Sequence, residues 1–295
     1  MLLVALVLGL AFFLIAGLDY SLYTLLVLRS KRKTSYLERV NSFEKSISTM
    51  PYVSVIVSVF EEADVIRRKL ENLAALDYPK DKLKVIVIDD DSKDGTAELA
   101  QAALHDLGLK GKVIRNPKRV GLNASLNIAI QNVEDMLICV SDADVLLDRD
   151  SLKNSVAVLE QFEGAGGVTG RLIPLLKEGN VVTRSEETYR VYYDRAMLAE
   201  SSLHSAFPGN GTLLVFNKSL VPAIPETHGS SDGNIAIRII KNGCRFLYVP
   251  SAEIREVVPE TSSQQRLQKV RLRPAGGKPP GPPPADGHSL RPFQR

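Results

Sequence analysis

The chain is poor in several residue types that would have defined its class at once. Of its 295 residues only two are cysteines, Cys139 and Cys244, and each lies in or beside an apolar run. Two cysteines so far apart exclude a disulfide framework and a cysteine metal knuckle, and they indicate buried thiols in a reducing compartment. The four histidines show no ligand spacing. The formal net charge of +3 is too small to indicate nucleic acid as a partner.

The overall composition is that of an ordinary globular protein. Hydrophobic residues make up 44% of the chain and charged residues 24%. The length allows one domain of about 200–250 residues plus appendages. Residues 274–295 are dominated by proline and glycine, a composition that cannot bury a core. We therefore expect a disordered tail over 274–295.

The first 28 residues predict a membrane anchor. Asp19 is the one formally charged side chain between Met1 and Leu28. At about 1.5 Å per residue such a segment is long enough to cross a hydrocarbon core of about 30 Å. A basic cluster at 29–33 follows, which predicts that the rest of the chain lies in the cytoplasm. A signal peptide is the alternative, disfavoured because no basic region precedes the apolar run and no clear cleavage site follows it. Residues 29–50 are predicted to form a polar, partly helical juxtamembrane linker.

The middle of the chain alternates apolar β-branched runs with helical patterns. The pattern predicts strands at 53–59, 83–88, 112–115 and 136–140, with helices at 62–76, 95–107 and 122–132 between them. This alternation indicates an α/β fold with right-handed βαβ units and a mostly parallel central sheet flanked by helices. In such sheets ligands bind at the carboxyl ends of the strands.

Beyond residue 150 the pattern is less regular. It predicts helices at 151–162, 183–202 and 233–241, strands at 166–170, 211–216 and 245–249, and a basic helix at 261–273. The strand at 245–249 is expected to close the folded part.

Acidic residues follow two of the predicted strands in a pattern that carries chemistry. Asp142 and Asp144 come directly after the apolar run 136–140. Two carboxylates one residue apart suit a hard divalent cation that holds a diphosphate, and a solvated turn is the alternative. Asp89 and Asp90 end the second strand. They are able to accept hydrogen bonds from a nucleobase and a ribose, with an acidic helix N-cap as the alternative.

Four segments of the chain, taken in order, resemble those of a known family. SVIVSVFEEADVI, VIVIDDDSKDGT, NPKRVGLNASLNIAI and CVSDADVLLD resemble the nucleotide-sugar half of the inverting family 2 glycosyltransferases, which have a GT-A (nucleotide-diphospho-sugar transferase) fold. The resemblance implies a GT-A domain over 51–273 and Mg²⁺ or Mn²⁺ as cofactor. It also implies a nucleoside-diphosphate sugar donor, UDP- or GDP-linked, and a lipid-linked or glycan acceptor.

The resemblance also implies roles for individual residues on the donor side. Phe60 and Glu61 are expected against the nucleobase, and Asp89 and Asp90 at base and ribose. Of the central pair, Asp142 is expected at the ribose or a metal-bound water and Asp144 at the cation, so that both belong to the metal site.

The resemblance implies two further donor-side residues. Arg119 and Asn127 are candidates for the diphosphate and the donor sugar. Their alternatives are a solvated basic turn for Arg119 and a helix-packing amide for Asn127.

On the acceptor side, Asp232 stands just before a predicted helix and matches the general base that removes the proton of the acceptor hydroxyl. A simple N-cap is the alternative. Gln268 and Arg271 resemble the family's Gln-x-x-Arg element and are expected at the diphosphate or acceptor, against a basic helix on anionic lipid as the alternative. The sequence departs from the family's pattern at Ser58, Glu61, Leu122, Ser231 and Leu272.

These observations predict a membrane-anchored, cytoplasm-facing glycosyltransferase that transfers a hexosyl or N-acetylhexosaminyl unit with inversion. Two other hypotheses remain open. A nucleotidyltransferase normally needs a glycine-rich loop with a lysine near its first strand, and 58–64 contains neither residue type. A non-catalytic nucleotide-sugar-binding relic is favoured by the departures from the family's pattern.

Overall fold

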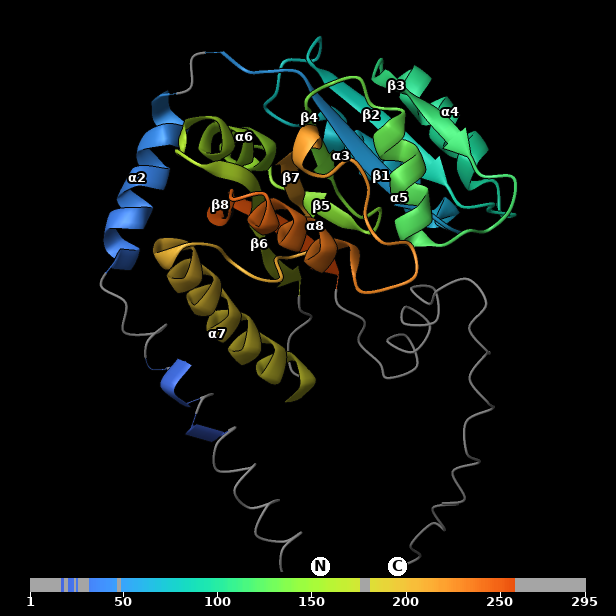
Figure 1. Ribbon diagram of the computed structural model, residues 1–295. Helices are drawn as coiled ribbons and strands as arrows, with labels where there is room; N and C mark the ends of the chain where they lie inside the picture. Colours follow the sequence, from blue (N-terminus) through green and yellow to red (C-terminus); the bar gives the residue numbers. More distant parts are fainter. Residues whose placement is uncertain are drawn as a thin grey trace, which may run out of the picture.

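The computed structural model describes residues 17, 18, 21–23, 25, 32–46, 49–175 and 181–257. Within these residues, one eight-stranded sheet in the order β3-β2-β1-β4-β7-β6-β8-β5 forms the centre of the molecule, and helices lie on both of its faces (Figure 1). The strands at one end of this order come from the first half of the chain. The arrangement confirms the predicted α/β architecture.

The first half of the chain builds the parallel part of the sheet. Its elements are β1 (Val53–Val59), α3 (Ala63–Ala74), β2 (Leu83–Asp89), α4 (Thr96–Asp106), β3 (Lys110–Arg115), α5 (Leu122–Gln131) and β4 (Leu137–Val140). β1 pairs in parallel with β2 and β4, and β2 pairs in parallel with β3. Each predicted element between 53 and 140 is confirmed, with ends displaced by three residues or fewer.

The second half adds a mixed part of the sheet. It consists of β5 (Val145–Leu147), α6 (Ser151–Gln161), β6 (Ala165–Leu175), α7 (Val181–Leu203), β7 (Leu214–Asn217), the 3₁₀ turn η1 (Lys218–Leu220), α8 (Ser231–Lys241) and β8 (Arg245–Val257). β7 is antiparallel to β4 and β6, β5 is antiparallel to β8, and β6 and β8 are parallel.

The predicted end of the last strand at Val249 was wrong. β8 runs on to Val257, because after an irregularity its residues 253–257 pair with 171–175 of β6 and its residues 254–256 pair with β5. β5 has three residues and was not predicted.

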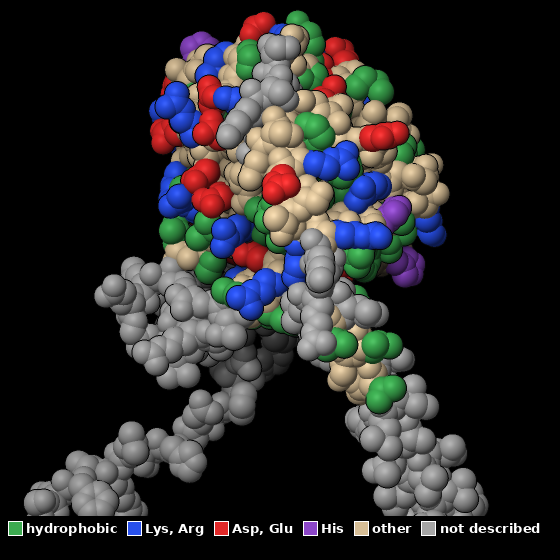
Figure 2. Space-filling model, turned by 90° about the vertical axis from the view of Figure 1, so that its left-hand side faces the viewer, with side chains coloured by type: hydrophobic (Ala, Val, Ile, Leu, Met, Phe, Trp, Pro, Cys, Tyr) green, Lys and Arg blue, Asp and Glu red, His purple; other side chains and the backbone are tan. Residues whose placement is uncertain are grey.

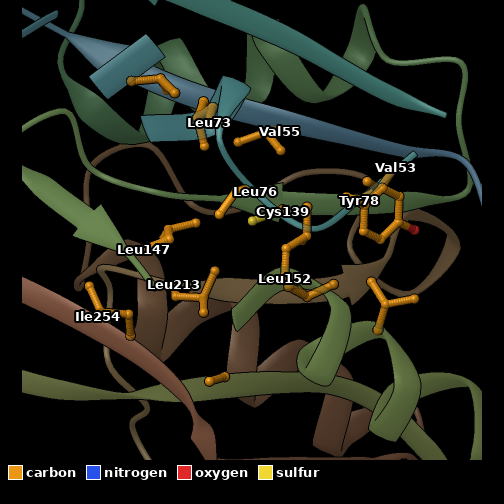
Figure 3. Packing of buried hydrophobic residues seen from close by; sticks show 14 of the residues in the cluster. Val53, Val55, Leu73, Leu76, Tyr78, Cys139, Leu147, Leu152, Leu213 and Ile254 are labelled. Atoms are coloured by element: carbon orange, nitrogen blue, oxygen red, sulfur yellow. The ribbon is translucent and has the colours of Figure 1, made fainter. Parts of the chain in front are cut away.

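The two faces of the sheet carry separate cores because successive side chains of a strand point to opposite faces. On one face Val53 and Val55 of β1 pack with Leu73 of α3 and Leu152 of α6 (Figure 3). On the other face Ile56 packs against residues of α5 and α8. A strand buried on both sides explains the near-continuous apolar run of β1.

The segment before β1 contributes a helix to the domain. α2 (Arg32–Ser46) packs against α6, and it buries Tyr36 and Val40. The Tyr36 hydroxyl donates to the Tyr248 carbonyl oxygen at 2.7 Å. Acidic and basic side chains are interspersed on the face that α2 occupies (Figure 2). The partly helical character predicted for 29–50 is confirmed.

Among the described residues, no helix combines the length and the apolar character needed to cross a bilayer. Most of the segment 1–28, for which an anchor is predicted, lies outside the described residues, and so do the predicted basic helix 261–273 and the tail 274–295.

Candidate active site

The ends of three neighbouring parallel strands meet at one edge of the sheet. Val59 of β1 pairs with Asp89 of β2, and Ile56 pairs with Val140 at the end of β4. Backbone hydrogen bonds extend this pairing beyond the strands, since the Asp90 N–H donates to the Val59 oxygen at 2.9 Å. The structure thus brings the predicted acidic segments together at the carboxyl edge, where ligands bind in open α/β sheets.

The loop after β1 is tied to the loop after β2. The Glu61 N–H donates to Ser92 Oγ at 2.8 Å, and the Glu62 N–H donates to Thr96 Oγ1 at 2.9 Å. Within the described part of the chain, the non-glycine residues with positive φ are Glu61 at 54° and Asp91 at 68°. Such backbone strain clusters at functional sites. Both strained residues lie at this edge.

Asp89 is fully buried at the end of β2. It accepts the Ser92 N–H at 3.2 Å and the Ser92 hydroxyl, and Arg115 Nε lies 3.4 Å from its Oδ2. Burial raises the pKa of Asp89, while the hydrogen bonds from Ser92 and the charge of Arg115 oppose the increase. Asp89 therefore fixes the turn that follows β2 and has its own counter-ion.

Asp90 holds the loop that leads into α5. Its side chain accepts three hydrogen bonds, from Asn116 Nδ2 at 2.9 Å, the Val120 N–H at 2.8 Å and the Gly121 N–H at 2.8 Å. Its residue is 4% exposed. Hydrogen bonds to a carboxylate are stronger than those between neutral groups, so the three donors hold this loop firmly to Asp90.

The helix-capping alternative does not apply to Asp89 or Asp90. α4 has Gly95 at its N-cap position, and the helix makes no side-chain capping bond there. Asp94 instead accepts the Thr96 N–H at 3.1 Å. The role at the helix terminus belongs to Asp94.

Phe60 and Arg119 lie together at this edge. The Arg119 guanidinium carbon is 3.7 Å from the centroid of the Phe60 ring, a cation–π contact. Both side chains are partly buried. A positive charge is thus held beside the predicted position of the base.

Asn127 performs the packing role that was the alternative for it. Its Nδ2 donates to the Ile224 carbonyl oxygen at 2.9 Å, and its Oδ1 accepts the Ile224 N–H at 2.8 Å. Asn123 holds the same segment through the Pro225 oxygen at 2.8 Å. α5 therefore fixes the chain that runs into α8.

The Asp142-Ala143-Asp144 triplet lies on the loop between β4 and β5. Asp142 is partly buried and Asp144 is exposed. Burial raises the pKa of Asp142 to about 7, Asp144 adds to the increase, and the Lys69 ammonium opposes it. The solvated-turn alternative fits Asp144, which is exposed. It does not fit Asp142, because its carboxylate lies in a poorly hydrated position.

The chemistry of this pair fits a shared cation. The described residues contain no cluster of three or more His, Cys, Asp or Glu side chains able to hold a metal ion. Mg²⁺ is usually bound by one or two carboxylates and completes its ligands with water and substrate phosphates. The carboxylates of Asp142 and Asp144 are hard oxygen donors of the kind that such a site uses.

Asp232 lies in the first turn of α8. Ser230 is the N-cap residue, and its Oγ accepts the Gly233 N–H at 3.4 Å. Asp232 Oδ1 accepts the same N–H at 2.8 Å. The simple N-cap alternative for Asp232 is therefore wrong, because Ser230 occupies that position.

Asp232 lies near the segment that holds the acidic loop. A methyl group placed at Gly211 would lie 3.7 Å from Asp232 Oδ2, so the two are close. The charge of Asp232 also contributes to the raised pKa of Asp142. The structure thus brings the predicted base and the predicted metal loop within electrostatic reach of each other.

Three residues near these groups were not predicted. Lys69 lies beneath the acidic loop, Tyr193 lies near Asp232, and Glu256 adds to the raised pKa of Asp142. The Tyr193 hydroxyl donates to the Gly209 oxygen at 2.7 Å. The sequence signal for Lys69 was a lysine on the apolar face of an amphipathic helix. Glu256 required the extended β8, which pairs it with Val145.

Gln268 and Arg271 lie outside the described residues. A cavity of about 500 Å³ lies beside the amino end of β4, where it is lined by Gln131, Met136 and Lys218 among others. That end of the strand is opposite the acidic edge, so the cavity is separate from the candidate site.

The fold and the acidic edge together define a GT-A-like α/β protein. Residues 51–274 match the family described as "Glycosyltransferase like family 2". The match covers more than half of the chain, and the protein belongs to this family.

Curated relatives support the assignment over most of the chain. A "Probable glycosyltransferase YdaM" of Bacillus subtilis is 24% identical over 245 residues, which cover 80% of this chain and 58% of that protein. A "Glucomannan 4-beta-mannosyltransferase 1" of Cyamopsis tetragonoloba is 26% identical over 260 residues, which cover 83% of this chain and 49% of that protein. The chain spans about half the length of these relatives.

A solved structure is similar as well. It is described as "Mannosyltransferase PcManGT from Pyrobaculum calidifontis in complex with GDP-Man and Mn2+", with a TM-score of 0.64, 26% identity and coverage of 84% of this chain and 72% of that one. The structure of S. aureus TarS in complex with UDP-GlcNAc has a TM-score of 0.54 at 18% identity, covers 72% of this chain and 60% of that one, and supports the fold alone.

Proposed function

We propose that this protein is an inverting glycosyltransferase that moves a hexosyl or N-acetylhexosaminyl unit from a nucleoside-diphosphate sugar to a lipid-linked or glycan acceptor. The observation that carries the proposal is the position of Asp232 beside Gly211, next to Thr212, whose carbonyl oxygen accepts the Ser141 hydroxyl at the start of the acidic loop. A candidate cation-binding loop and a candidate base are thus close together. Membership of the family supports it. The similar mannosyltransferase structure contains GDP-Man and Mn²⁺, which supports the donor class.

The donor half of the site orients the nucleotide. Phe60 and Glu61 border the base, and the turns held by Asp89 and Asp90 shape the pocket for base and ribose. Asp142 and Asp144 would hold Mg²⁺ or Mn²⁺, which when bound neutralises the charge of the departing diphosphate. The Arg119 guanidinium adds fixed positive charge on the same side.

The acceptor half supplies the proton acceptor. In the proposed reaction Asp232 takes the proton of the acceptor hydroxyl as its oxygen bonds to the anomeric carbon. The bond from that carbon to the diphosphate oxygen breaks on the opposite face, so the anomeric centre inverts. The base must therefore face the donor across the sugar. The position of Asp232 close to the acidic loop supports this role.

We also propose that residues 1–28 anchor the protein in a membrane, with the catalytic domain on the cytoplasmic side. The apolar run and the basic cluster that follows it support this. In a membrane preparation, the full chain should resist alkaline carbonate and dissolve in detergent. Release by carbonate would contradict anchoring.

A binding measurement followed by a transfer assay tests the enzymatic proposal. Calorimetry of the purified full chain with GDP and UDP should show affinity that increases when Mn²⁺ is present. A screen of nucleoside-diphosphate sugars should then find one that is hydrolysed and transferred. Binding without any turnover would favour the non-catalytic relic, and turnover of a nucleoside triphosphate would favour a nucleotidyltransferase.

A further inference from the structure

A lysine is completely buried beneath the loop that carries Asp142 and Asp144. Lys69 of α3 has 0% exposure and lies on the helix face that buries Ile66, Leu70 and Leu73. Its Nζ donates to Ser141 Oγ at 2.7 Å and to the Val145 carbonyl oxygen at 3.0 Å. These two acceptors bracket the acidic triplet on either side. The ammonium group therefore holds both ends of the loop.

The connection continues from the loop to the acceptor side. Ser141 Oγ donates to the Thr212 carbonyl oxygen at 2.8 Å, and Thr212 Oγ1 donates to Asn210 Oδ1 at 3.1 Å. The residue between them, Gly211, is the one that lies against Asp232. One chain of buried hydrogen bonds thus runs from α3 through the acidic loop to the segment beside the candidate base.

The position of Lys69 is costly for stability alone. Burying an ammonium group carries a desolvation penalty that an apolar side chain of similar size would avoid. Both hydrogen-bond acceptors of the ammonium are neutral oxygens. Burial lowers the pKa of Lys69 to about 8, and the charges of Asp142 and Asp144 are among those that oppose the decrease. An ammonium group here donates to both ends of the loop that carries the two carboxylates, which a leucine would not do.

We propose that Lys69 and Ser141 are positioning residues that fix the acidic loop for cation binding and align it with the segment beside Asp232. The inference rests on the proposed function. Residues that orient metal ligands from behind typically change metal affinity by about 10–100-fold when they are replaced. The loss of either group should have an effect in this range.

Ser141→Ala is the cleaner variant, because it cuts the chain of hydrogen bonds and keeps the charge of Lys69. Lys69→Met removes the charge and both donors while keeping the length of the side chain. Ser155→Ala is the matched control: Ser155 is also a fully buried serine, and its Oγ donates only within α6, to the Ser151 oxygen at 2.8 Å. Calorimetry measures the affinity of each protein for GDP and UDP with and without Mn²⁺.

The measured quantity is the factor by which Mn²⁺ increases nucleotide affinity. We expect this factor to fall by about 10-fold or more in Ser141→Ala and Lys69→Met and to stay unchanged in Ser155→Ala. A merely structural role would lower the fraction of competent protein, which changes the stoichiometry and not the factor. Equal factors in Ser141→Ala, Ser155→Ala and the unmodified protein would overturn the inference. If the unmodified protein showed no Mn²⁺ effect, the proposed metal-assisted function itself would fail.

Discussion

The two halves of the candidate site differ in how their acids are held. On the β1–β4 side, Asp89 and Asp90 are buried, and their side chains together accept hydrogen bonds from two loops. On the α8 side, Asp232 is partly exposed and accepts an N–H from its own helix. Hydrogen bonds within the protein hold Asp89 and Asp90 in place. The α8 side presents a half-buried carboxylate that no other loop holds by a hydrogen bond in the described part of the chain.

This difference indicates which substitutions should change stability and which should change catalysis. Replacing an acid that anchors a loop should lower the free energy of unfolding. Replacing an acid that faces the site should lower turnover. The departures from the family's pattern at Leu122 and Ser231 leave the anchoring bonds of Asp90 and the cap at Ser230 in place.

The largest expected effect comes from Asp144→Asn, because Asp144 is exposed and its proposed role is in cation binding. Transfer activity should fall by about 10³-fold, corresponding to the several kcal/mol that a bound cation supplies to the transition state. The melting temperature should change little. Assays of donor hydrolysis with thermal denaturation check both, and Asp150→Asn, also exposed, is the control. Full activity in Asp144→Asn would remove it from the metal site.

Asp232→Asn should have the next largest effect on transfer activity. Loss of a general base lowers turnover by about 10²–10⁴-fold. Donor affinity should stay within about twofold, since Asp232 contacts the acceptor in the proposed reaction. Comparison of kcat with the calorimetric Kd for the nucleoside diphosphate measures the separation. A parallel fall in donor affinity would instead indicate that Asp232 supports the fold of the site.

Asp90→Ala should act on stability. The substitution leaves the Val120 and Gly121 N–H groups and the Asn116 amide without their acceptor, which costs about 2–4 kcal/mol of unfolding free energy. Urea denaturation measures the loss. Asp106→Ala, which removes an exposed ion pair with Arg67, is the control and should cost less than about 1 kcal/mol. Equal losses in the two variants would show that Asp90 is not an anchor.

Asn127→Ala should have the smallest effect. It tests whether the two halves of the candidate site act separately. Loss of its two bonds to Ile224 should cost about 1–2 kcal/mol. Because that segment leads into α8, transfer should fall more than donor affinity. The control is Asn132→Ala, whose exposed amide donates to Ile128 of its own helix and accepts from Lys112. A larger fall in donor affinity than in transfer would place Asn127 at the donor.

The parallel half of the fold could be predicted because its information is local. Near-continuous apolar strands and amphipathic helices alternate over short distances, and each strand end carries its own acids. The continuation of β8 to Val257 could not be predicted, because it depends on pairing with β6, far away in the sequence. β5 is too short to give a pattern.

The same distinction holds for the site. Asp89, Asp90, Asp142 and Asp144 were visible as acids after strands. Their internal bonds were not, because the partners of Asp90 lie 26 to 31 residues away. The contact between Lys69 and Ser141 spans 72 residues and has no local signature beyond a charge on an apolar helix face.

The central claim is that a cation-binding donor half and a separate base on the acceptor half share one site. The most direct test measures, by calorimetry, the factor by which Mn²⁺ increases the affinity for a nucleoside diphosphate in Asp144→Asn and Asp232→Asn. The account predicts that the factor is lost in Asp144→Asn and retained in Asp232→Asn. An equal factor in both variants, whether lost or retained, would contradict it.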